Sequence, residues 1–284
     1  RKLKFLLNRA TLSKIYTVFI RPHFEYACEV WDGCLIDEVN RLEKLQLEAA
    51  RIVTGLPRYA SSSSLYYETG WDLLSERRRI RKLTLFYKIH TGLAPSFLQE
   101  LLPLDVGSQT KYELRNSHNY NLPSSRLRFS TSSFFPSTVR MWNNVPLETR
   151  NRDSVASFKN AIRVQQKSAP VYFAHGKRNL NILHTRLRHN VSTLNYDLFR
   201  INVKNDASCQ CGHKCENVFH FFLECPLFIT QRNTLLNHLR NVVRNRAPID
   251  LNLILSGNAD LSISDNQNVF KFVQSYISST KRFT

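Results

Sequence analysis

The sequence is short of acidic residues, glycine and methionine, and it contains no long apolar run. Its 284 residues include 22 Asp and Glu against 40 Lys and Arg, 8 Gly and one Met. No window of about 18 uncharged apolar residues occurs, so the sequence predicts no transmembrane helix. The first residues, RKLKF, lack the apolar core of a secretion signal, which favours an intracellular protein, nuclear or cytoplasmic. Because no Met begins the chain, we also expect residue 1 to be a cut edge of a longer protein.

The common catalytic motifs are missing as well. The sequence has no glycine-rich phosphate-binding motif, no His-Glu-x-x-His zinc motif and no Gly-x-Ser-x-Gly nucleophile motif. No two Asp residues are adjacent, and two-metal chemistry needs carboxylates that converge. We therefore assign no catalytic residue and expect this chain by itself to have no polymerase or nuclease activity.

Apolar residues and positive charge are abundant. Hydrophobic residues make up 42% and aromatic residues 11% of the chain, which is enough for a packed core and excludes wholesale disorder. The net charge is +18, with an isoelectric point near 9.9, and the excess is spread over both halves. This balance favours RNA and DNA as partners over an anionic membrane. A basic protein whose charge merely aids solubility is the alternative.

The spacing of apolar residues predicts a mainly α fold in three parts. The first part, 1–103, is a helical region. A connector with short helices follows at 104–170. Within it, alternating apolar residues at 104–135 predict extended segments or a small hairpin. The third part, 171–284, is a small helical domain. Within the first part we expect helices at 10–20, 38–54 and 72–91, ended by Arg21–Pro22, Gly55 and Gly92 respectively.

Four of the six cysteines lie within seventeen residues. These are Cys209, Cys211, Cys215 and Cys225, whereas Cys28 and Cys34 stand apart. In a chain without a secretion signal, such a cluster indicates a metal site more often than disulfides. Zinc takes four Cys or His ligands in a tetrahedron, and with all four positions filled by protein it is structural rather than catalytic.

Two sets of zinc ligands fit this spacing. One is Cys209, Cys211, His220 and Cys225, and the other replaces Cys209 with Cys215. His220 and Cys225 belong to both sets, and His213 is a spare in either. The alternative without metal is a helical hairpin that buries ordinary thiols.

Two basic clusters are candidate nucleic-acid contacts. The first places five cations on one predicted helix: Arg77, Arg78, Arg79, Arg81 and Lys82. The second precedes the cysteine cluster and consists of Arg178, Arg186, Arg188 and Arg200. It lies near Tyr196 and Phe199 in the sequence, whose rings can stack on bases or pack in a core. Each cluster has two interpretations, because a run of charges contacts phosphates in some proteins and forms a solvated helix face in others.

Several blocks of the sequence resemble the C-terminal region of LINE-type, jockey-like reverse transcriptases, which belong to retrotransposons without long terminal repeats. Residues 16–32, YTVFIRPHFEYACEVWD, resemble the segment after the palm, and residues 41–55, RLEKLQLEAARIVTG, are similar to the thumb helix. Shorter blocks, LSERR, KIHTGL and FFPSTVRMWNNVP, begin at residues 74, 88 and 134. Residues 186–189, 195–200 and 209–226 resemble the family's CCHC tail.

The resemblance implies a function. The thumb-like region would hold the template–primer duplex, and the zinc-stabilised tail would hold template RNA or target DNA during target-primed reverse transcription. The family's spacing favours Cys209 and Cys211 as the cysteine pair and makes Cys215 a spare. Fingers, palm and endonuclease lie upstream in the family, so those regions are expected partners in the parent protein. The alternative is a degenerate or host-retained fragment that acts as a protein-interaction module.

Overall fold

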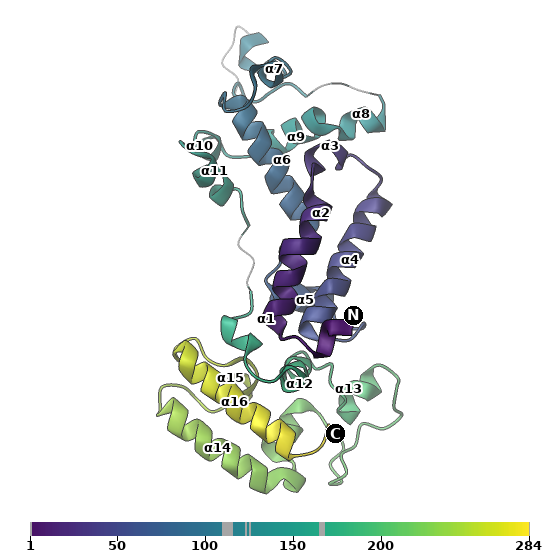
Figure 1. Ribbon diagram of the computed structural model, residues 1–284, viewed down its shortest axis with the longest axis vertical. Helices are drawn as coiled ribbons and strands as arrows, with labels where there is room; N and C mark the ends of the chain where they lie inside the picture. The colour runs from purple at the N-terminus through teal and green to yellow at the C-terminus, as the bar shows by residue number, and fades with distance from the viewer. Residues whose placement is uncertain (1, 110–115, 123, 125, 165–167, 284) are drawn as a thin grey trace. The chain divides into compact units, whose positions relative to one another are not determined.

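The computed structural model describes residues 2–109, 116–122, 124, 126–164 and 168–283 (Figure 1). Helices form almost all of the regular secondary structure in these residues, and the only β pairing among them is one bridge between Asp105 and Tyr120. The predicted mainly α fold is therefore confirmed. The chain forms two compact units: unit 1 comprises 1–17, 47–71 and 167–284, and unit 2 comprises 18–46 and 72–166.

Unit 1 contains the two ends of the chain. Its elements are η1 (Lys2–Phe5), α1 (Arg9–Ile15), α5 (Ser62–Thr69), η4 (Val171–Ala174), α12 (Arg178–Arg188), α13 (Asn195–Arg200), η5 (His220–Glu224), η6 (Pro226–Phe228), α14 (Ile229–Val243), α15 (Leu251–Ser256) and α16 (Ile263–Ser279). The second half of α4 (Ile36–Thr54) also belongs to unit 1.

Unit 2 is built around the long helix α6. Its elements are α2 (Arg21–Glu25), α3 (Cys28–Trp31), the first half of α4, α6 (Leu74–His90), α7 (Ser96–Gln99), η3 (Gly107–Gln109), α8 (Arg128–Ser132), α9 (Phe134–Asn143), α10 (Leu147–Arg150) and α11 (Val155–Ala161). A π-helical segment, η2 (Tyr16–Ile20), begins in unit 1 and ends in unit 2.

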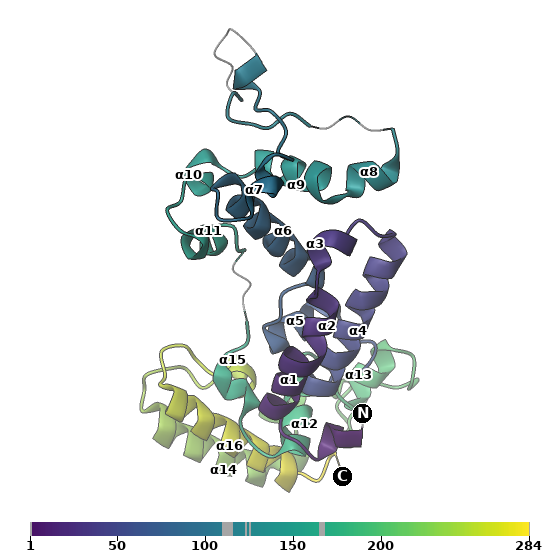
Figure 2. The same cartoon turned by 45° about the horizontal axis from the view of Figure 1, so that its top comes forward.

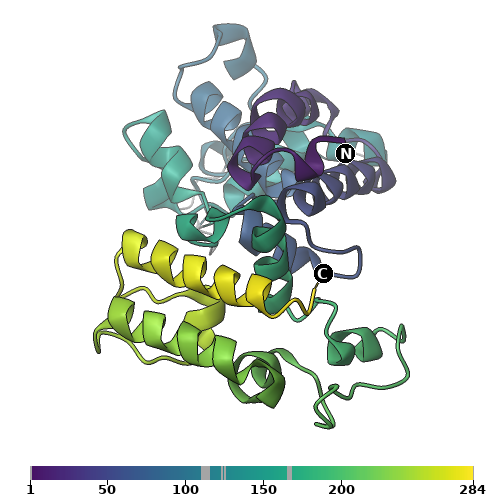
Figure 3. The ribbon, with the colours of Figure 1, turned by 60° about the horizontal axis from the view of Figure 1, so that its bottom comes forward.

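The core of unit 1 is rich in aromatic residues. Helices α14 and α16 lie side by side, and α12 and α15 also pack on α16 (Figure 3). Phe270 of α16 is fully buried, and its ring lies 5.6 Å from that of Phe173 and 4.4 Å from the imidazole of His184. The hydroxyl of Tyr276, further along α16, donates a hydrogen bond to the carbonyl oxygen of Phe221 at 2.6 Å. That bond joins α16 to the segment that carries the cysteine cluster.

The core of unit 2 forms where α9 and α11 pack on α6 (Figure 2). Tyr87 of α6 stacks on Phe158 of α11 with ring centres 4.4 Å apart, and Trp142 of α9 lies 5.0 Å from Phe86. All four side chains are buried. Aromatic pairs at these separations stabilise a core beyond the area they bury.

Helix α4 ends where the sequence predicts, at Gly55. The backbone of Gly55 has φ +77°, and its N–H donates to the carbonyl oxygen of Arg51 at 2.9 Å. A Cβ at this position would lie 2.5 Å from Cγ1 of Ile182 on α12. Glycine is therefore favoured at position 55 for two reasons: the backbone is left-handed, and α12 approaches too closely for a side chain.

Two local predictions need correction. Arg21–Pro22 does not end a helix, because α2 begins at Arg21 and Pro22 occupies its first turn, where its missing N–H costs no hydrogen bond. The predicted hairpin exists only as a short pairing, in which Val106 donates to Asn119 at 2.8 Å and Asn121 donates to Leu104 at 2.9 Å. Residues 110–115 lie outside the described residues.

The two compact units group the chain differently from the linear parts 1–103, 104–170 and 171–284. Segments from near the N-terminus complete unit 1, whose larger part comes from the predicted third domain. The three-part division stays a prediction about which pieces fold independently.

Replacing Gly55 with alanine tests the fit between α4 and α12. We expect Gly55→Ala to lower the free energy of unfolding of unit 1 by about 3 kcal/mol, because strain at positive φ adds to overpacking against the buried Ile182. Gly212→Ala is the matched control, since Gly212 has φ +90° but nothing within 4 Å of an added Cβ. It should cost about 1 kcal/mol. If urea denaturation gives the same loss of unfolding free energy for both variants, the close contact with Ile182 does not add to the cost of Gly55→Ala.

Candidate metal centre and the predicted basic residues

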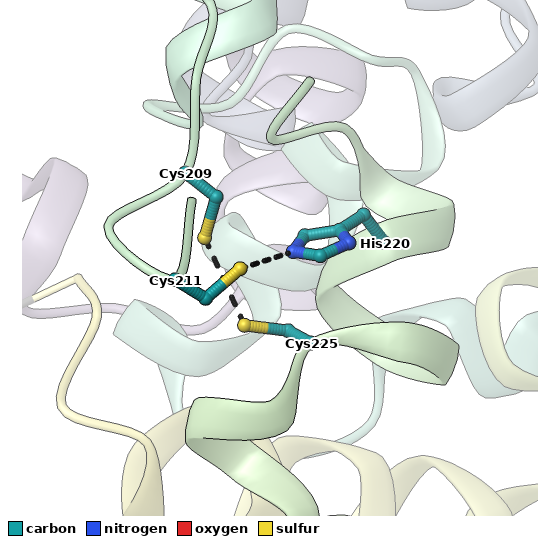
Figure 4. Close-up of side chains that lie close together, drawn as sticks. All are labelled: Cys209, Cys211, His220 and Cys225. Atoms are coloured by element: carbon teal, nitrogen blue, oxygen red, sulfur yellow. Dashed lines mark hydrogen bonds between the residues drawn. The ribbon is translucent and has the colours of Figure 1, made fainter. Parts of the chain in front are cut away.

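A tight turn brings the first two cysteines together. The N–H of Cys209 donates to the carbonyl oxygen of His213 at 2.8 Å, and the N–H of Gly212 donates back to Cys209 at 2.9 Å. Gly212, at φ +90°, supplies the left-handed conformation that this turn needs. The turn directs the side chains of Cys209 and Cys211 toward the same point (Figure 4).

The other two side chains of the centre come from a single π-helical turn. The segment η5 begins at His220, and the N–H of Cys225 donates to the carbonyl oxygen of His220 at 2.8 Å. That bond spans five residues, which is the repeat of a π turn, and it brings the two side chains to one side. Arg232 of α14 donates to the carbonyl oxygen of Cys225 at 2.9 Å and holds the end of the turn.

Cys209, Cys211, His220 and Cys225 form a group that could hold a metal ion. Their four potential ligand atoms lie within 4.8 Å of one another. The two sulfurs of Cys209 and Cys225 are 3.7 Å apart, and Sγ of Cys211 lies 3.3 Å from Nε2 of His220 (Figure 4). Three of the four residues are buried. The sequence predicted this group as one of two ligand sets.

Burial shapes the proton chemistry of the group. It raises the pKa of the Cys225 thiol to about 12 and also raises the pKa of Cys209. A metal cation binds the thiolate form, so loading at neutral pH must release protons.

The remaining residues of the cluster surround this group. Cys215, the alternate ligand in the sequence, is not a member of it. The exposed ring of His213 stacks on His220, with centres 4.2 Å apart and planes 8° apart. Nδ1 of His220 faces Oε2 of Glu224 at 3.5 Å, and His213, His220 and Glu224 form a second group of potential ligands. Glu224 is not among the residues predicted from the sequence, although it lies four residues after His220, a spacing that places two side chains on one helix face.

Two arginines of α12, Arg178 and Arg186, donate to backbone carbonyl oxygens of the protein. Arg178 donates to the carbonyl oxygens of Ile52 and Val53, each at 2.6 Å, and Arg186 donates to that of Gly55 at 2.9 Å. These carbonyls lie at the C-terminal end of α4, where a helix lacks its own donors and carries partial negative charge. Arg186 therefore caps a helix inside unit 1, and its predicted phosphate contact would have to compete with this bond.

Arg188 belongs to a buried ionic cluster. Its Nη1 lies 2.7 Å from Glu68, whose side chain is fully buried and also contacts His189 at 2.9 Å and Arg9 at 2.7 Å. The guanidinium of Arg188 also lies 3.5 Å above the ring of Phe173. As the Arg188 side chain is only 5% exposed, a phosphate backbone outside the fold does not reach it. The predicted nucleic-acid contact at Arg188 is corrected on this ground.

The five α6 cations are all ion-paired. Arg77 pairs with Glu25 and Asp72, Arg79 with Glu76 at 2.7 Å, and Arg81 with Glu29 at 3.0 Å. Among these three cations, Arg81 has the most exposed side chain, at 42%. Phosphate contact at Arg77, Arg79 and Arg81 stays a prediction.

The other two α6 cations are buried. Arg78 and Lys82 both pair with Asp32, at 2.6 and 3.2 Å, and their side chains are 2% and 4% exposed. A solvated helix face is therefore wrong for both residues. So is a direct contact with a nucleic-acid backbone on the outer surface, because neither charge is accessible there.

Comparison with protein-family models, curated proteins and solved structures finds no match to this chain. Among the described residues, no helix is both long and apolar enough to cross a membrane. The assignment of a function therefore depends on the residues and their geometry.

Single cysteine substitutions distinguish the two ligand sets. We expect Cys209→Ser and Cys225→Ser to lose a bound metal ion, because each removes a buried sulfur of the group. Cys215→Ser, outside the group, should retain it. Metal content after gel filtration, together with the thiolate absorption of the cobalt-loaded protein, measures both. Retention by Cys209→Ser with loss by Cys215→Ser would establish the other set.

Glu68→Gln tests the buried ionic cluster. Burial by itself raises the pKa of Glu68, but Arg188, His189 and Arg9 outweigh it and hold that pKa well below its usual range. The charged carboxylate therefore stabilises the fold above the unfolded pKa of about 4.3, and this contribution falls as the pH drops below it. At pH 7 the variant should lose about 3–5 kcal/mol, the cost of breaking a buried pair.

The pH profile separates this effect from a general loss of stability. In urea denaturation between pH 7 and pH 3, Glu68→Gln should show a smaller decline than the wild type. Glu48→Gln is the control, since Glu48 is 38% exposed beside Arg51 and should change stability by less than about 1 kcal/mol. Parallel profiles for wild type and Glu68→Gln would contradict the assigned role.

Proposed function

We propose that the four-residue group binds zinc and that this zinc is structural. The main support is that the distances between ligand atoms match those of a tetrahedral zinc site. Zinc–sulfur bonds of about 2.3 Å and zinc–nitrogen bonds of about 2.0 Å place two sulfurs about 3.8 Å apart and a sulfur and a nitrogen about 3.5 Å apart. The observed separations are 3.7 Å and 3.3 Å. Three thiols and one imidazole are also the donors that zinc prefers over calcium or magnesium.

Zinc in this position would join two parts of unit 1. Cys209 and Cys211 come from a turn, whereas His220 begins η5 and Cys225 directly follows it. The segment η5 contacts α14 and, through the Tyr276 hydroxyl, α16. A fully protein-ligated ion leaves no position for an activated water, so its contribution is to folding. Glu224 would accept a hydrogen bond from Nδ1 of His220 and so present Nε2 to the metal.

We further propose that the chain binds RNA and DNA as the C-terminal part of a retrotransposon RNA-directed DNA polymerase. The resemblance to the thumb and CCHC tail of that family, the net charge of +18 and the cysteine spacing support this role. The missing fingers, palm and endonuclease of the parent protein would supply catalysis. A protein-interaction module is the competing function, and the binding experiment below distinguishes the two.

The surface beside the metal group offers a better nucleic-acid contact than Arg186 and Arg188. Three exposed cations lie close to the group in the sequence: Arg200, Lys204 and Lys214. Two aromatic rings of the same region, Phe199 and Phe219, are 44% and 47% exposed. Exposed cations with nearby aromatic rings suit single-stranded nucleic acid, whose phosphates and bases they contact.

Salt dependence tests the proposal. Each phosphate contact releases counterions, so the logarithm of affinity should fall by about 0.7–0.9 per contact for each unit of log salt. Changing Arg200, Lys204 and Lys214 together to Ala should reduce that slope by about two to three units, as measured by fluorescence anisotropy with a labelled single-stranded RNA.

A variant with the same charge change controls for the general field of the protein. Arg240, Lys177 and Lys271 are exposed cations on other elements of unit 1, and their triple Ala variant loses equal charge. It should leave the slope within about one unit of the wild type. Equal slopes in both triple variants would refute the metal-proximal surface, and no affinity at low salt would leave the interaction module as the better function.

A further inference from the structure

Unit 2 contains a large cavity whose lining includes none of the residues proposed above to bind zinc, nor Arg200, Lys204 or Lys214. Its volume is about 850 Å³, and it is lined by the turn that precedes α4 and by residues of α6, α8 and α9. Helix α8 packs on α9, and α9 packs on α6. The volume lies in the range of pockets that bind small organic molecules, about 300–1,000 Å³.

One wall of the cavity is apolar and remains accessible. Leu35 and Ile36 are 66% and 59% exposed, and Phe129 on α8 is 83% exposed. Val39 and Met141 complete this wall and are half-buried. Apolar side chains that face a cavity rather than a core gain free energy when an apolar ligand removes them from water.

The opposite side of the cavity carries two buried cations but only one carboxylate to neutralise them. Arg78 and Lys82 line the cavity, and both depend on a single carboxylate, Asp32. The second partner of Lys82 is the neutral hydroxyl of Ser137, at 2.7 Å. Within the described residues, Nη1 of Arg78 is buried and has no hydrogen-bond partner. This side of the cavity therefore holds two cations and one anion. A buried charge without a counter-charge lowers the stability of the fold.

A further cation lies at the cavity where solvent can reach it. Arg140 of α9 lines the cavity and is exposed. The fourth cation, Arg79, is neutralised by two bonds of 2.7 Å to Glu76. An anionic group in the cavity would thus have Arg140 as a direct partner and would lie in the field of the Arg78–Lys82 pair.

We propose that this cavity binds an amphipathic organic anion. Its apolar body lies against Leu35, Ile36 and Phe129, and its carboxylate or phosphate head lies toward Arg140 and the buried pair. The proposal is independent of the zinc group and of the surface at Arg200, Lys204 and Lys214, since every lining residue belongs to unit 2.

Four probes separate the contributions of charge and apolar body. Octanoate and octyl phosphate carry both, octyltrimethylammonium reverses the charge, and inorganic phosphate lacks the apolar chain. In isothermal titration calorimetry of the whole chain, we expect one saturable site for at least one of the two octyl anions, whichever head group the site prefers. The other two probes should bind at least about tenfold more weakly, a difference of about 1.4 kcal/mol.

Variants at the rim locate the site. Arg140→Glu should weaken binding of the octyl anion about fivefold or more, because it replaces an attractive partly exposed charge with a repulsive one. Lys159→Glu, an exposed cation of α11 outside the cavity lining, is the matched control and should change affinity less than twofold. Ile36→Ser should also weaken octanoate or octyl phosphate, while leaving any weak binding of inorganic phosphate unchanged.

Lys82→Met distinguishes a ligand role from a structural one. It removes the excess charge and keeps the length of the side chain, leaving Arg78 and Asp32 as a balanced pair. We expect the free variant to be as stable as the wild type or more so, with octyl-anion affinity reduced at least threefold. A variant that loses stability and keeps affinity would overturn the proposal. So would equal binding of octyltrimethylammonium and octanoate, tight binding of phosphate alone, or no binding of either octyl anion.

Discussion

Arginine side chains that donate to backbone carbonyl oxygens hold much of this protein together. A chain with 40 basic and 22 acidic residues cannot pair every cation with a carboxylate of its own. Arg178 and Arg186 use the carbonyls at the end of α4, and Arg150 uses those of Val145, His118 and Asn143. The planar guanidinium suits this role, because its five N–H donors can satisfy several carbonyls that would otherwise be unpaired. Burial lowers the pKa of Arg178 to about 10, which still leaves it charged at neutral pH.

Two internal carboxylates are each shared among several cations. Glu68 serves Arg9, Arg188 and His189 in unit 1, and Asp32 serves Arg78 and Lys82 in unit 2. The two centres differ in what surrounds the cations. In unit 1, Arg188 also bonds the carbonyl of Leu255 and covers the ring of Phe173, whereas in unit 2 the cations border a cavity. Incomplete compensation beside open volume is what makes the second centre a candidate binding site.

The metal group illustrates a different constraint, in which local geometry prepares the ligands and tertiary contacts fix them. The Cys209–Gly212 turn and the π turn from His220 to Cys225 each set one pair of side chains by short-range hydrogen bonds. Bringing the pairs together depends on longer contacts, including the bond of Arg232 to Cys225 and that of Tyr276 to Phe221. A zinc ion at the meeting point would stabilise both turns at once.

The sequence by itself determined the helical class, the end of α4 at Gly55 and the membership of His220 and Cys225 in the metal group. Those features follow from local causes: apolar periodicity, a left-handed residue and a fixed spacing between ligands. It also contained a signal that went unused, since Glu25, Glu29 and Asp32 are spaced to match the cations of α6. Only the tertiary structure decided which cations face solvent, because Arg78, Lys82, Arg186 and Arg188 find partners from 46 to 131 residues away in the chain. A run of basic residues in the sequence shows that hydrogen-bond acceptors are needed. The fold alone determines whether those acceptors are carboxylates, backbone carbonyls or an external anion.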